Sequence, residues 1–265
     1  MKRILIFLAS AMMLSHLAFA ADVSIDGEAF EGAKLINSVT YVPIRAFSER
    51  LGEFDVAWDA PNRAATVTGE NVELNAAIGR GYIECNDRCV YSGNDNIIVD
   101  GSAYVPVRSL AKTLGASVEW NAVTRTAEVT TGAERFKTAN EFYDRDNLYW
   151  LSKIINAESE GESLQGKIAV GNVVLNRVRS SEFPDTVYGV IFDKKGGVQF
   201  TPVANGSIYK EPNEESIVAA KICLEDYKLS NKNILFFLNP TISTSTWIPD
   251  NRDYVMTIGR HEFYS

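Results

Sequence analysis

A repeated segment in the first half of the chain restricts the possible folds more than any other feature. The sequence YVPIRAFSERLG at 41–52 returns as YVPVRSLAKTLG at 104–115, and each copy leads to a tryptophan, Trp58 or Trp120, and then to a β-rich tail. In each copy, Tyr-Val-Pro predicts a strand that ends at proline, and the following residues predict a short helix closed by glycine. The tail predicts another strand. Each copy is therefore expected to form a small strand-helix-strand module.

Two of the three cysteines lie between the copies. Residues 82–85 and 88–91 predict the two strands of a hairpin, with Cys85 and Cys89 on either side of its turn. In an exported protein such a pair can close a disulfide or remain as two thiols, and the spacing leaves both open. Cys223 lies in an apolar helical segment and is expected to be a core residue.

The first twenty residues predict a signal peptide. They begin with Lys2 and Arg3, continue as an apolar run, and end in Ala-Phe-Ala, a small-x-small cleavage site. Cleavage would start the mature chain near Ala21 and place the protein outside the cell or in the cell wall. The alternative, an uncleaved membrane anchor, is disfavoured by the polar residues within the run. No other apolar segment is long enough to span a bilayer.

The charge balance argues against several classes of partner. Without the leader, the chain has 24 basic and 34 acidic side chains, and no cluster of lysine and arginine stands out. Nucleic-acid binding and polybasic membrane binding both depend on such clusters, so we expect neither partner after signal cleavage. A large polymeric ligand would instead be held by aromatic side chains and hydrogen bonds.

The second half of the chain changes to helical periodicity near Asp146, after a polar segment, 133–145, that is expected to be a linker. One stripe of the first helix combines apolar residues with one acid, and it contains Leu148, Leu151, Ile154, Ile155 and Glu158. The opposite, wettable side is expected to carry Lys153, Asn156 and Glu160. Glu162 lies beyond Gly161, where the helix should end. Only Glu158 of the three acids therefore points toward the apolar side.

More helices are predicted after this one. A largely apolar helix is expected from about 163 to 179, where Ala169 and Gly171 would let a neighbour pack closely. Further helical segments are expected at about 184–192 and 212–228, separated by a Gly-rich and aromatic loop, and the remaining C-terminal segment is expected to be extended. The predicted fold class is α+β, and 265 residues suffice for two domains.

Several kinds of catalytic site are missing from the sequence. The predicted mature chain has a single histidine, His261, and no HExxH spacing, so we expect no metal site and no cofactor. A Cys223–His261 pair would lack the setting that activates a cysteine nucleophile. No phosphate-binding loop and no GxSxG motif is present.

Glu158 is the remaining candidate for chemistry. Desolvation on an apolar helix face disfavours the ionised carboxylate, so this group should keep its proton longer than a free glutamate and be able to donate it. Cleavage of a glycosidic bond requires such a donor, since protonation of the bridging oxygen helps the leaving group to depart. On spacing alone, Glu158 can equally be a residue at a helix end that bonds nearby backbone groups.

Two family resemblances extend this interpretation. Residues 22–132 resemble the copper amine oxidase N-terminal-like module, a stalk-type repeat of exported bacterial proteins. Its name implies copper, yet this segment has no histidine, so we interpret it as a metal-free spacer or wall-associating module. Arg45 and Arg108, which match across the two copies, are expected to be structural hydrogen-bond donors.

A second resemblance covers residues 146–265. This part of the chain resembles the catalytic domain of SleB/CwlJ-type cell-wall hydrolases, the spore cortex-lytic family. The segments that carry the resemblance are INAESEGE, LQGKIAVGNVVLNRV, FPDTVYGVI, QFTPV, FFLNP and TIGRHEFY. The resemblance implies a compact, mostly helical domain akin to lysozyme and lytic transglycosylases, which acts on peptidoglycan glycan strands. It also implies Glu158 as the catalytic glutamate. Cortex-lytic members often carry a recognised wall-binding repeat, and its replacement here by a stalk-type module argues against a role in spore germination.

The same resemblance implies supporting roles for other residues. Glu162 is expected to orient the active-site loop, and Asn176 with Arg177 to support it by structural bonds. The glycan groove is expected to be lined by Gln199, Phe200, Thr201, Asn239 and Trp247, although Phe200 and Trp247 can equally be core aromatics.

The sequence thus predicts a secreted glycosidase that cleaves between N-acetylmuramic acid and N-acetylglucosamine, as a lytic transglycosylase with one catalytic glutamate. The alternatives are a non-catalytic peptidoglycan-binding protein and a cell-wall hydrolase of amidase specificity. The oligomeric state and the choice between hydrolytic and anhydro products stay open.

Overall fold

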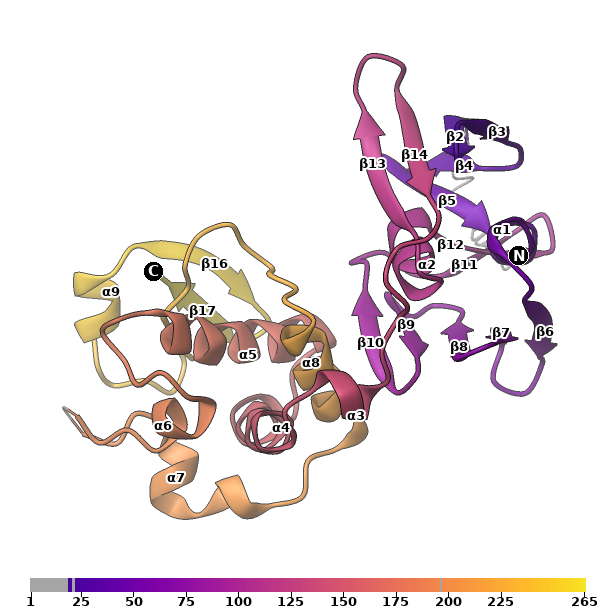
Figure 1. Cartoon of the computed structure of the whole chain (residues 1–265). Coiled ribbons are helices and arrows are strands. Elements are labelled where there is room, and N and C mark those ends of the chain that lie inside the picture. Colours follow the sequence, from indigo (N-terminus) through magenta and orange to yellow (C-terminus); the bar gives the residue numbers. More distant parts are fainter. Residues whose placement is uncertain (1–18, 21, 196) are drawn as a thin grey trace, which may run out of the picture.

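A computed structural model describes residues 19–20, 22–195 and 197–265 of the chain. The structure is α+β, with an N-terminal lobe made mainly of strands and a C-terminal lobe made mainly of helices (Figure 1). Most of the predicted signal peptide lies outside the described residues. Its last two residues form the short strand β1 (Phe19–Ala20), which pairs with β4, so cleavage after Ala20 would leave β4 as the edge of its sheet.

The N-terminal lobe contains two helices, α1 (Ile44–Leu51) and α2 (Val107–Thr113). Its further strands are β2 (Asp22–Ile25), β3 (Glu28–Phe30), β4 (Lys34–Ile36), β5 (Val39–Pro43), β6 (Asp55–Asp59), β7 (Ala64–Gly69), β8 (Val72–Ala77), β9 (Tyr82–Cys85), β10 (Arg88–Tyr91), β11 (Ile97–Val99), β12 (Ser102–Pro106), β13 (Ser117–Asn121) and β14 (Thr126–Thr130). They form three sheets with the strand orders β1-β4-β5-β12-β11, β10-β9-β8-β7-β6 and β13-β14-β2-β3.

Each copy of the sequence repeat forms a strand, a helix and a two-stranded hairpin. The first copy is β5-α1-β6-β7 and the second is β12-α2-β13-β14. The equivalent strands β5 and β12 lie side by side and pair antiparallel, with Val42 opposite Val105. The sequence analysis did not assign a strand to the tryptophans, whereas the structure places Trp58 in β6 and Trp120 in β13.

The C-terminal lobe is built on two long helices, α4 (Arg145–Ser159) and α5 (Leu164–Arg179). Its other elements are α6 (Val187–Ile191), α7 (Thr201–Asn205), the 3-10 helix η1 (Ser207–Tyr209), α8 (Glu214–Leu224), β15 (Phe236–Leu238), α9 (Trp247–Asn251), β16 (Tyr254–Ile258) and β17 (His261–Tyr264). The last three strands form a sheet with the order β15-β17-β16. The segment between 192 and 212, which was expected to be a loop, therefore contains the short helix α7. The C-terminal segment, which was expected to be extended, contains the short helix α9.

Side-chain caps fix where the helices begin. Asp144 caps α4 by accepting a hydrogen bond from the Asn147 backbone at 2.8 Å. Ser163 caps α5 in the same way, as its sequence position predicts. The close approach expected at Gly171 is confirmed, because a β-carbon there would meet the Cys223 sulfur at 2.6 Å and Ile155 at 2.9 Å. Helices α4, α5 and α8 can therefore pack tightly.

The expectation that Lys153 and Asn156 lie on a wettable side of α4 is wrong, because both are buried. The Lys153 Nζ atom donates to Glu211 Oε1 at 2.8 Å and to the Lys210 carbonyl at 3.1 Å. The Asn156 side chain accepts hydrogen bonds from the α8 N-terminus. Helix α4 is enclosed on both sides, so its polar residues are buried with partners instead of hydrated. Of the polar residues expected on that side, only Glu160 is exposed.

Besides a smaller cluster in the N-terminal lobe that contains Ile36, Tyr41 and Tyr104, the described structure has two large hydrophobic cores, one in each lobe. The hairpin β9-β10 joins them, because Cys85 is buried in the first core and Cys89 in the second. All three cysteines are free thiols. The disulfide alternative therefore finds no support: the two side chains belong to different cores, and Cys85 pairs in register with Arg88 rather than with Cys89.

The lobes are joined by a buried ion pair. Arg88 of β10 donates to both carboxylate oxygens of Glu225, at 2.7 and 2.9 Å, and its guanidinium lies between the rings of Phe136 and Phe142. Tyr143 also donates to Glu225, at 3.0 Å. The segment expected to be a plain linker contains α3 (Ala139–Phe142) and packs against this pair, since its aromatic residues cover the arginine.

Among the described residues, no helix has the length and hydrophobicity needed to cross a bilayer.

Candidate active site

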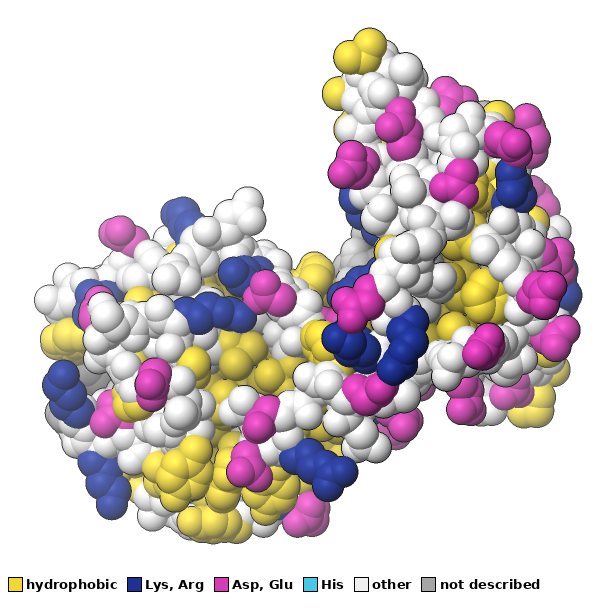
Figure 2. All heavy atoms as spheres, viewed as in Figure 1, with side chains coloured by type: hydrophobic (Ala, Val, Ile, Leu, Met, Phe, Trp, Pro, Cys, Tyr) yellow, Lys and Arg dark blue, Asp and Glu magenta, His cyan; other side chains and the backbone are white. Residues whose placement is uncertain are grey.

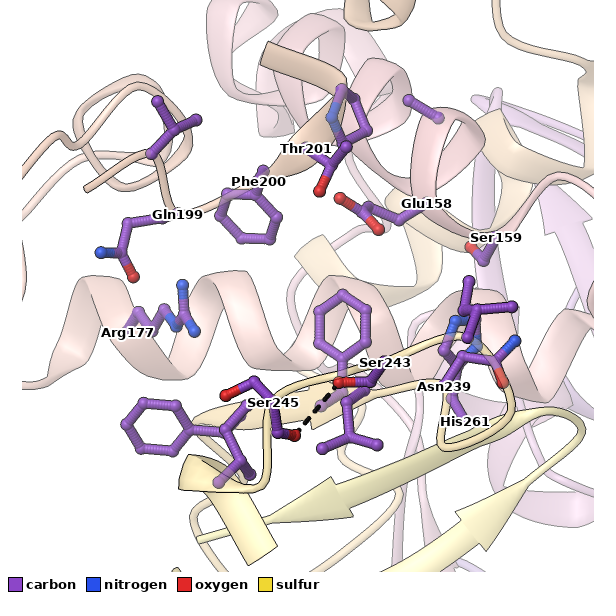
Figure 3. Close-up of a pocket in the computed structure, with 18 of the residues that line it drawn as sticks. Glu158, Ser159, Arg177, Gln199, Phe200, Thr201, Asn239, Ser243, Ser245 and His261 are labelled. Carbon is purple, nitrogen blue, oxygen red and sulfur yellow. Dashed lines mark hydrogen bonds between the residues drawn. The ribbon is translucent and has the colours of Figure 1, made fainter. Parts of the chain in front are cut away.

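A groove of about 1250 Å³ runs across the C-terminal lobe and contains Glu158. One wall is formed by the end of α4 and by the segment that leads into α7, and the other by β15, the loop after it and the β16-β17 turn. Figure 3 shows the Glu158 carboxyl group pointing into the groove toward Thr201, with Asn239, Ser243 and His261 on the opposite wall. The groove is partly open to solvent.

Burial raises the pKa of Glu158 to about 7, and the positive charge of Arg177 opposes this only in part. The cause is the one expected from the sequence, because the last turn of α4 places this carboxyl above the apolar core of the lobe. At neutral pH a large fraction of the Glu158 side chains therefore carries a proton, as a general acid must.

Glu162 has the opposite electrostatic character. Its burial disfavours charge, but hydrogen bonds from the Arg260 side chain, at 2.8 Å, and from the Arg260 backbone outweigh this and lower its pKa. Gly259 makes this contact possible, since its φ is +58° and a β-carbon there would collide with the Glu162 carboxylate. Glu162 is therefore held as a carboxylate that ties the end of α4 to the β16-β17 turn.

Asn176 does not line the groove but supports its wall. The Asn176 side chain donates to the Ile234 carbonyl at 3.0 Å, and the neighbouring Arg177 donates to the Leu235 carbonyl at 2.8 Å. Together they hold the segment that enters β15. The Arg177 guanidinium lines the groove and packs against the rings of Phe183, Phe200 and Phe236. Its burial lowers its pKa to about 10, against the effect of Asp193 and Glu158.

The remaining predicted residues all line the groove: Gln199, Phe200, Thr201, Asn239 and Trp247. Phe200 is almost fully buried and also belongs to the core, so both interpretations of this residue hold. Trp247 is half exposed at the rim, where Arg252 lies over its ring. Gln199 donates to the carbonyl of Lys195, within its own loop.

The sequence analysis missed His261 as a groove residue. It is buried against Phe237 and Phe263, and burial lowers its pKa, so the ring is neutral near pH 7. One indication of such a role was available in the sequence, because His261 is the single histidine of the predicted mature chain. Cys223, by contrast, is buried between α5 and α8 and does not line the groove, so the two cannot act as a pair. In the described part of the chain, no three His, Cys, Asp or Glu residues cluster to hold a metal ion.

Comparison with known proteins assigns the family. A family model described as Cell Wall Hydrolase matches residues 161–264, and one described as Copper amine oxidase N-terminal domain matches 24–129. A spore cortex-lytic enzyme of Bacillus cereus is 30% identical over 221 residues, covering 71% of this chain and 83% of the relative. The chain belongs to the spore cortex-lytic family of cell wall hydrolases. Glu158 lies three residues before the matched range of the hydrolase model.

Other members of this family match about half of the chain. The spore cortex-lytic enzyme of Oceanobacillus iheyensis is 35% identical over 133 residues, covering 50% of this chain and 46% of that relative. The solved catalytic domain of the germination-specific lytic transglycosylase SleB from Bacillus anthracis is 37% identical. It covers 46% of this chain and 97% of its own, with a TM-score of 0.42. The sequence relationships, rather than this superposition, show the family.

The raised pKa of Glu158 predicts how activity depends on pH. If the protonated carboxyl is the reactive form, kcat/KM should be level below about pH 6 and fall about tenfold per unit well above the pKa of about 7. A rate profile on soluble glycan chains between pH 4 and pH 9 measures this. A rate that rises from pH 7 to pH 9 would show that the reactive form is not the acid.

Proposed function

We propose that this protein cleaves the glycan strand of peptidoglycan between N-acetylmuramic acid and N-acetylglucosamine, as a lytic transglycosylase. The observation that carries the proposal is the half-buried Glu158 carboxyl, whose pKa is raised to about 7 and which points into an open groove. Membership of the cell wall hydrolase family supports peptidoglycan as the substrate. A protein that only binds glycan gains nothing from a desolvated acid, which disfavours the binding-protein alternative.

In the proposed reaction, Glu158 acts twice. Its carboxyl first donates a proton to the bridging oxygen as the bond to the anomeric carbon of the muramic acid breaks. The resulting Glu158 carboxylate then takes the proton of the muramic acid 6-hydroxyl, whose oxygen attacks that anomeric carbon. A 1,6-anhydro ring closes, Glu158 regains its proton, and no water is consumed.

Two of the other acids that line the groove, Glu162 and Glu160, fit this single-residue cycle. A retaining or inverting hydrolase needs a second carboxylate that attacks the sugar or activates water. Glu162, the nearest acid in the motif, is engaged by Arg260 and kept ionised at the turn that it stabilises. Glu160 is exposed at the rim of the groove. We propose that Glu162 positions the wall of the site and that Glu158 alone transfers the proton.

The products distinguish the two reaction types. Wild-type digests of purified peptidoglycan should contain fragments that end in anhydromuramic acid, one water lighter than hydrolytic products. Mass spectrometry of the digest, before and after borohydride reduction, measures this, since anhydro ends resist reduction. Reducible muramic acid ends would contradict the transglycosylase and make Glu162 the first candidate for a second catalytic carboxylate. Release of peptides with intact glycan would instead support the amidase alternative.

We also propose that the protein is exported, with its leader cleaved after Ala20. The basic start, apolar run and Ala-Phe-Ala sequence support this, as does a substrate that lies outside the cytoplasmic membrane. N-terminal sequencing of the exported protein should begin near Ala21. Recovery of a chain that still begins at Met1 would contradict the cleavage and favour an anchor.

A further inference from the structure

A second groove lies between the two lobes. Its volume is about 790 Å³ and it shares no residue with the groove that contains Glu158. One side is formed by α2, β13 and β14 of the N-terminal lobe, and the other by the end of α8 with Tyr227. Figure 1 places β13 and β14 on the side of the N-terminal lobe that faces the C-terminal lobe, and Figure 2 shows the molecule hollowed between the lobes.

Aromatic side chains supply the apolar part of this groove. Trp120 of β13 is 50% exposed, and among the described residues its ring pairs with no other aromatic ring and no cation. Tyr91 and Tyr227, one from each lobe, meet edge to face with ring centroids 4.6 Å apart. An exposed indole next to a hollow lined by further rings is a surface on which sugar rings can stack.

The groove also carries uncompensated positive charge. Its acids are already engaged, because Glu225 binds Arg88 and Lys112, and Asp226 binds Arg179. Arg108 donates to the Val118 carbonyl at 2.7 Å, which holds it beside the strand of Trp120. In the described structure neither Arg108 nor Arg125 forms an ion pair. In a chain of net negative charge, two unpaired arginines in one groove favour a ligand that carries carboxylates.

The internal repeat provides a built-in comparison. Trp58 holds the same place in β6 that Trp120 holds in β13: each is the fourth residue of its strand, pairs with an alanine, and is about half exposed, at 47% and 50%. Arg63 matches Arg125, both in turns with positive φ. Yet β6 lies on the far side of the N-terminal lobe in Figure 1, and Trp58 lines neither groove. Of the two tryptophans, only Trp120 borders the groove between the lobes.

We infer that the groove between the lobes is a second binding site for peptidoglycan, in which Trp120 stacks on sugar rings of the glycan strand while Arg108 and Arg125 bind carboxylates of its peptide stems. The inference rests on the proposed function, because it takes its ligand from the polymer that the first groove would cut. A polymer extends beyond one cleavage site, so a second contact on the same molecule raises the effective concentration of substrate at the first.

Binding to insoluble peptidoglycan tests the inference. The full chain with Glu158→Gln serves as the parent, so that the polymer stays intact, and sedimentation gives the dissociation constant. Adding Trp120→Ala should weaken binding about fivefold or more, as truncation of an aromatic anchor does. The matched change Trp58→Ala should leave it within about twofold, as expected for a residue outside the site. Equal losses for the two variants, or no loss with Trp120→Ala, would overturn the inference.

A second pair of matched variants tests the role of the arginines. Arg125→Asn and Arg63→Asn both place a residue that tolerates positive φ, so neither turn is strained. Arg125→Asn should weaken binding to intact peptidoglycan but not to glycan from which the peptides have been removed, whereas Arg63→Asn should change neither. An equal loss on both polymers would overturn the assignment of Arg125 to the peptide carboxylates.

A turnover assay separates the two proposals. On short soluble glycan fragments, which span only the first groove, Trp120→Ala in the wild-type chain should cleave at the wild-type rate. If the wild-type chain cleaves these fragments while Trp120→Ala still binds insoluble peptidoglycan like its parent, the inference fails and the proposed function stands. If the wild-type chain cleaves nothing while Trp120→Ala loses binding, the proposed function fails and the second site stands.

Discussion

Replacing Glu158 with glutamine should lower the rate of peptidoglycan cleavage by at least about a hundredfold, the usual loss when a general acid is removed. Glutamine keeps the shape of the side chain but cannot donate the proton. The rate is measured as the release of new glycan ends from purified peptidoglycan. Glu160→Gln is the matched control, since Glu160 lies two residues away and is exposed, and it should change the rate by less than about threefold.

The same substitution should make the protein more stable at neutral pH. The folded-state pKa of Glu158, about 7, lies above the ordinary value of 4.5, so between these values the folded state binds more protons than the unfolded state. The wild-type chain therefore loses stability as pH rises from about 4.5 to 7, and Glu158→Gln lacks this loss. Denaturant unfolding at pH 4.5 and 7.5 should show the variant gaining stability relative to wild type at the higher pH.

Stability and activity together make this test decisive. An inactive variant that is at least as stable as wild type shows that Glu158 serves catalysis rather than folding. A variant that keeps its activity would exclude Glu158 as the acid and move the search to Glu162. A wild-type chain that binds peptidoglycan without releasing ends would instead favour the non-catalytic alternative.

Replacing Arg88 with methionine should cost about 3 kcal/mol of unfolding free energy, the lower end of the range for breaking a buried ion pair. Arg88 and Glu225 are 4% and 3% exposed, so the change leaves a buried carboxylate with only Lys112 and Tyr143 as partners. Methionine fills much of the space between the flanking rings, so the loss reports mainly on charge. Denaturant unfolding followed by tryptophan fluorescence measures it.

The matched control removes an arginine from an exposed pair. Arg179 and Asp226 are 45% and 68% exposed, and Arg179→Met should cost less than about 1 kcal/mol. The defect of Arg88→Met should also shrink at pH 5, because the Glu225 carboxyl, once it has lost Arg88, takes up a proton more readily. Equal small costs for the two variants would show that the lobes do not depend on the buried pair.

Much of the candidate site could be predicted from the sequence. The raised pKa of Glu158 was predicted because helix periodicity, a local property, places it on the apolar stripe that turns toward the core, where it is desolvated. The helix starts expected near 163 and 212 also depend on neighbours within a few residues, and Ser163 and Asn213 cap α5 and α8 there. Such features need no knowledge of the rest of the fold.

Tertiary structure alone decided the features that join distant segments. Lys153 and Asn156 have the sequence pattern of a solvated face, yet they are buried because the η1 region and α8 cover that side of α4 and supply their partners. The ionised state of Glu162 depends on Arg260, 98 positions away, and the buried Arg88–Glu225 pair spans 137 positions. The inter-lobe groove likewise exists only because the lobes meet there. Periodicity describes one element at a time, whereas burial, pairing and charge at these positions depend on which elements come together.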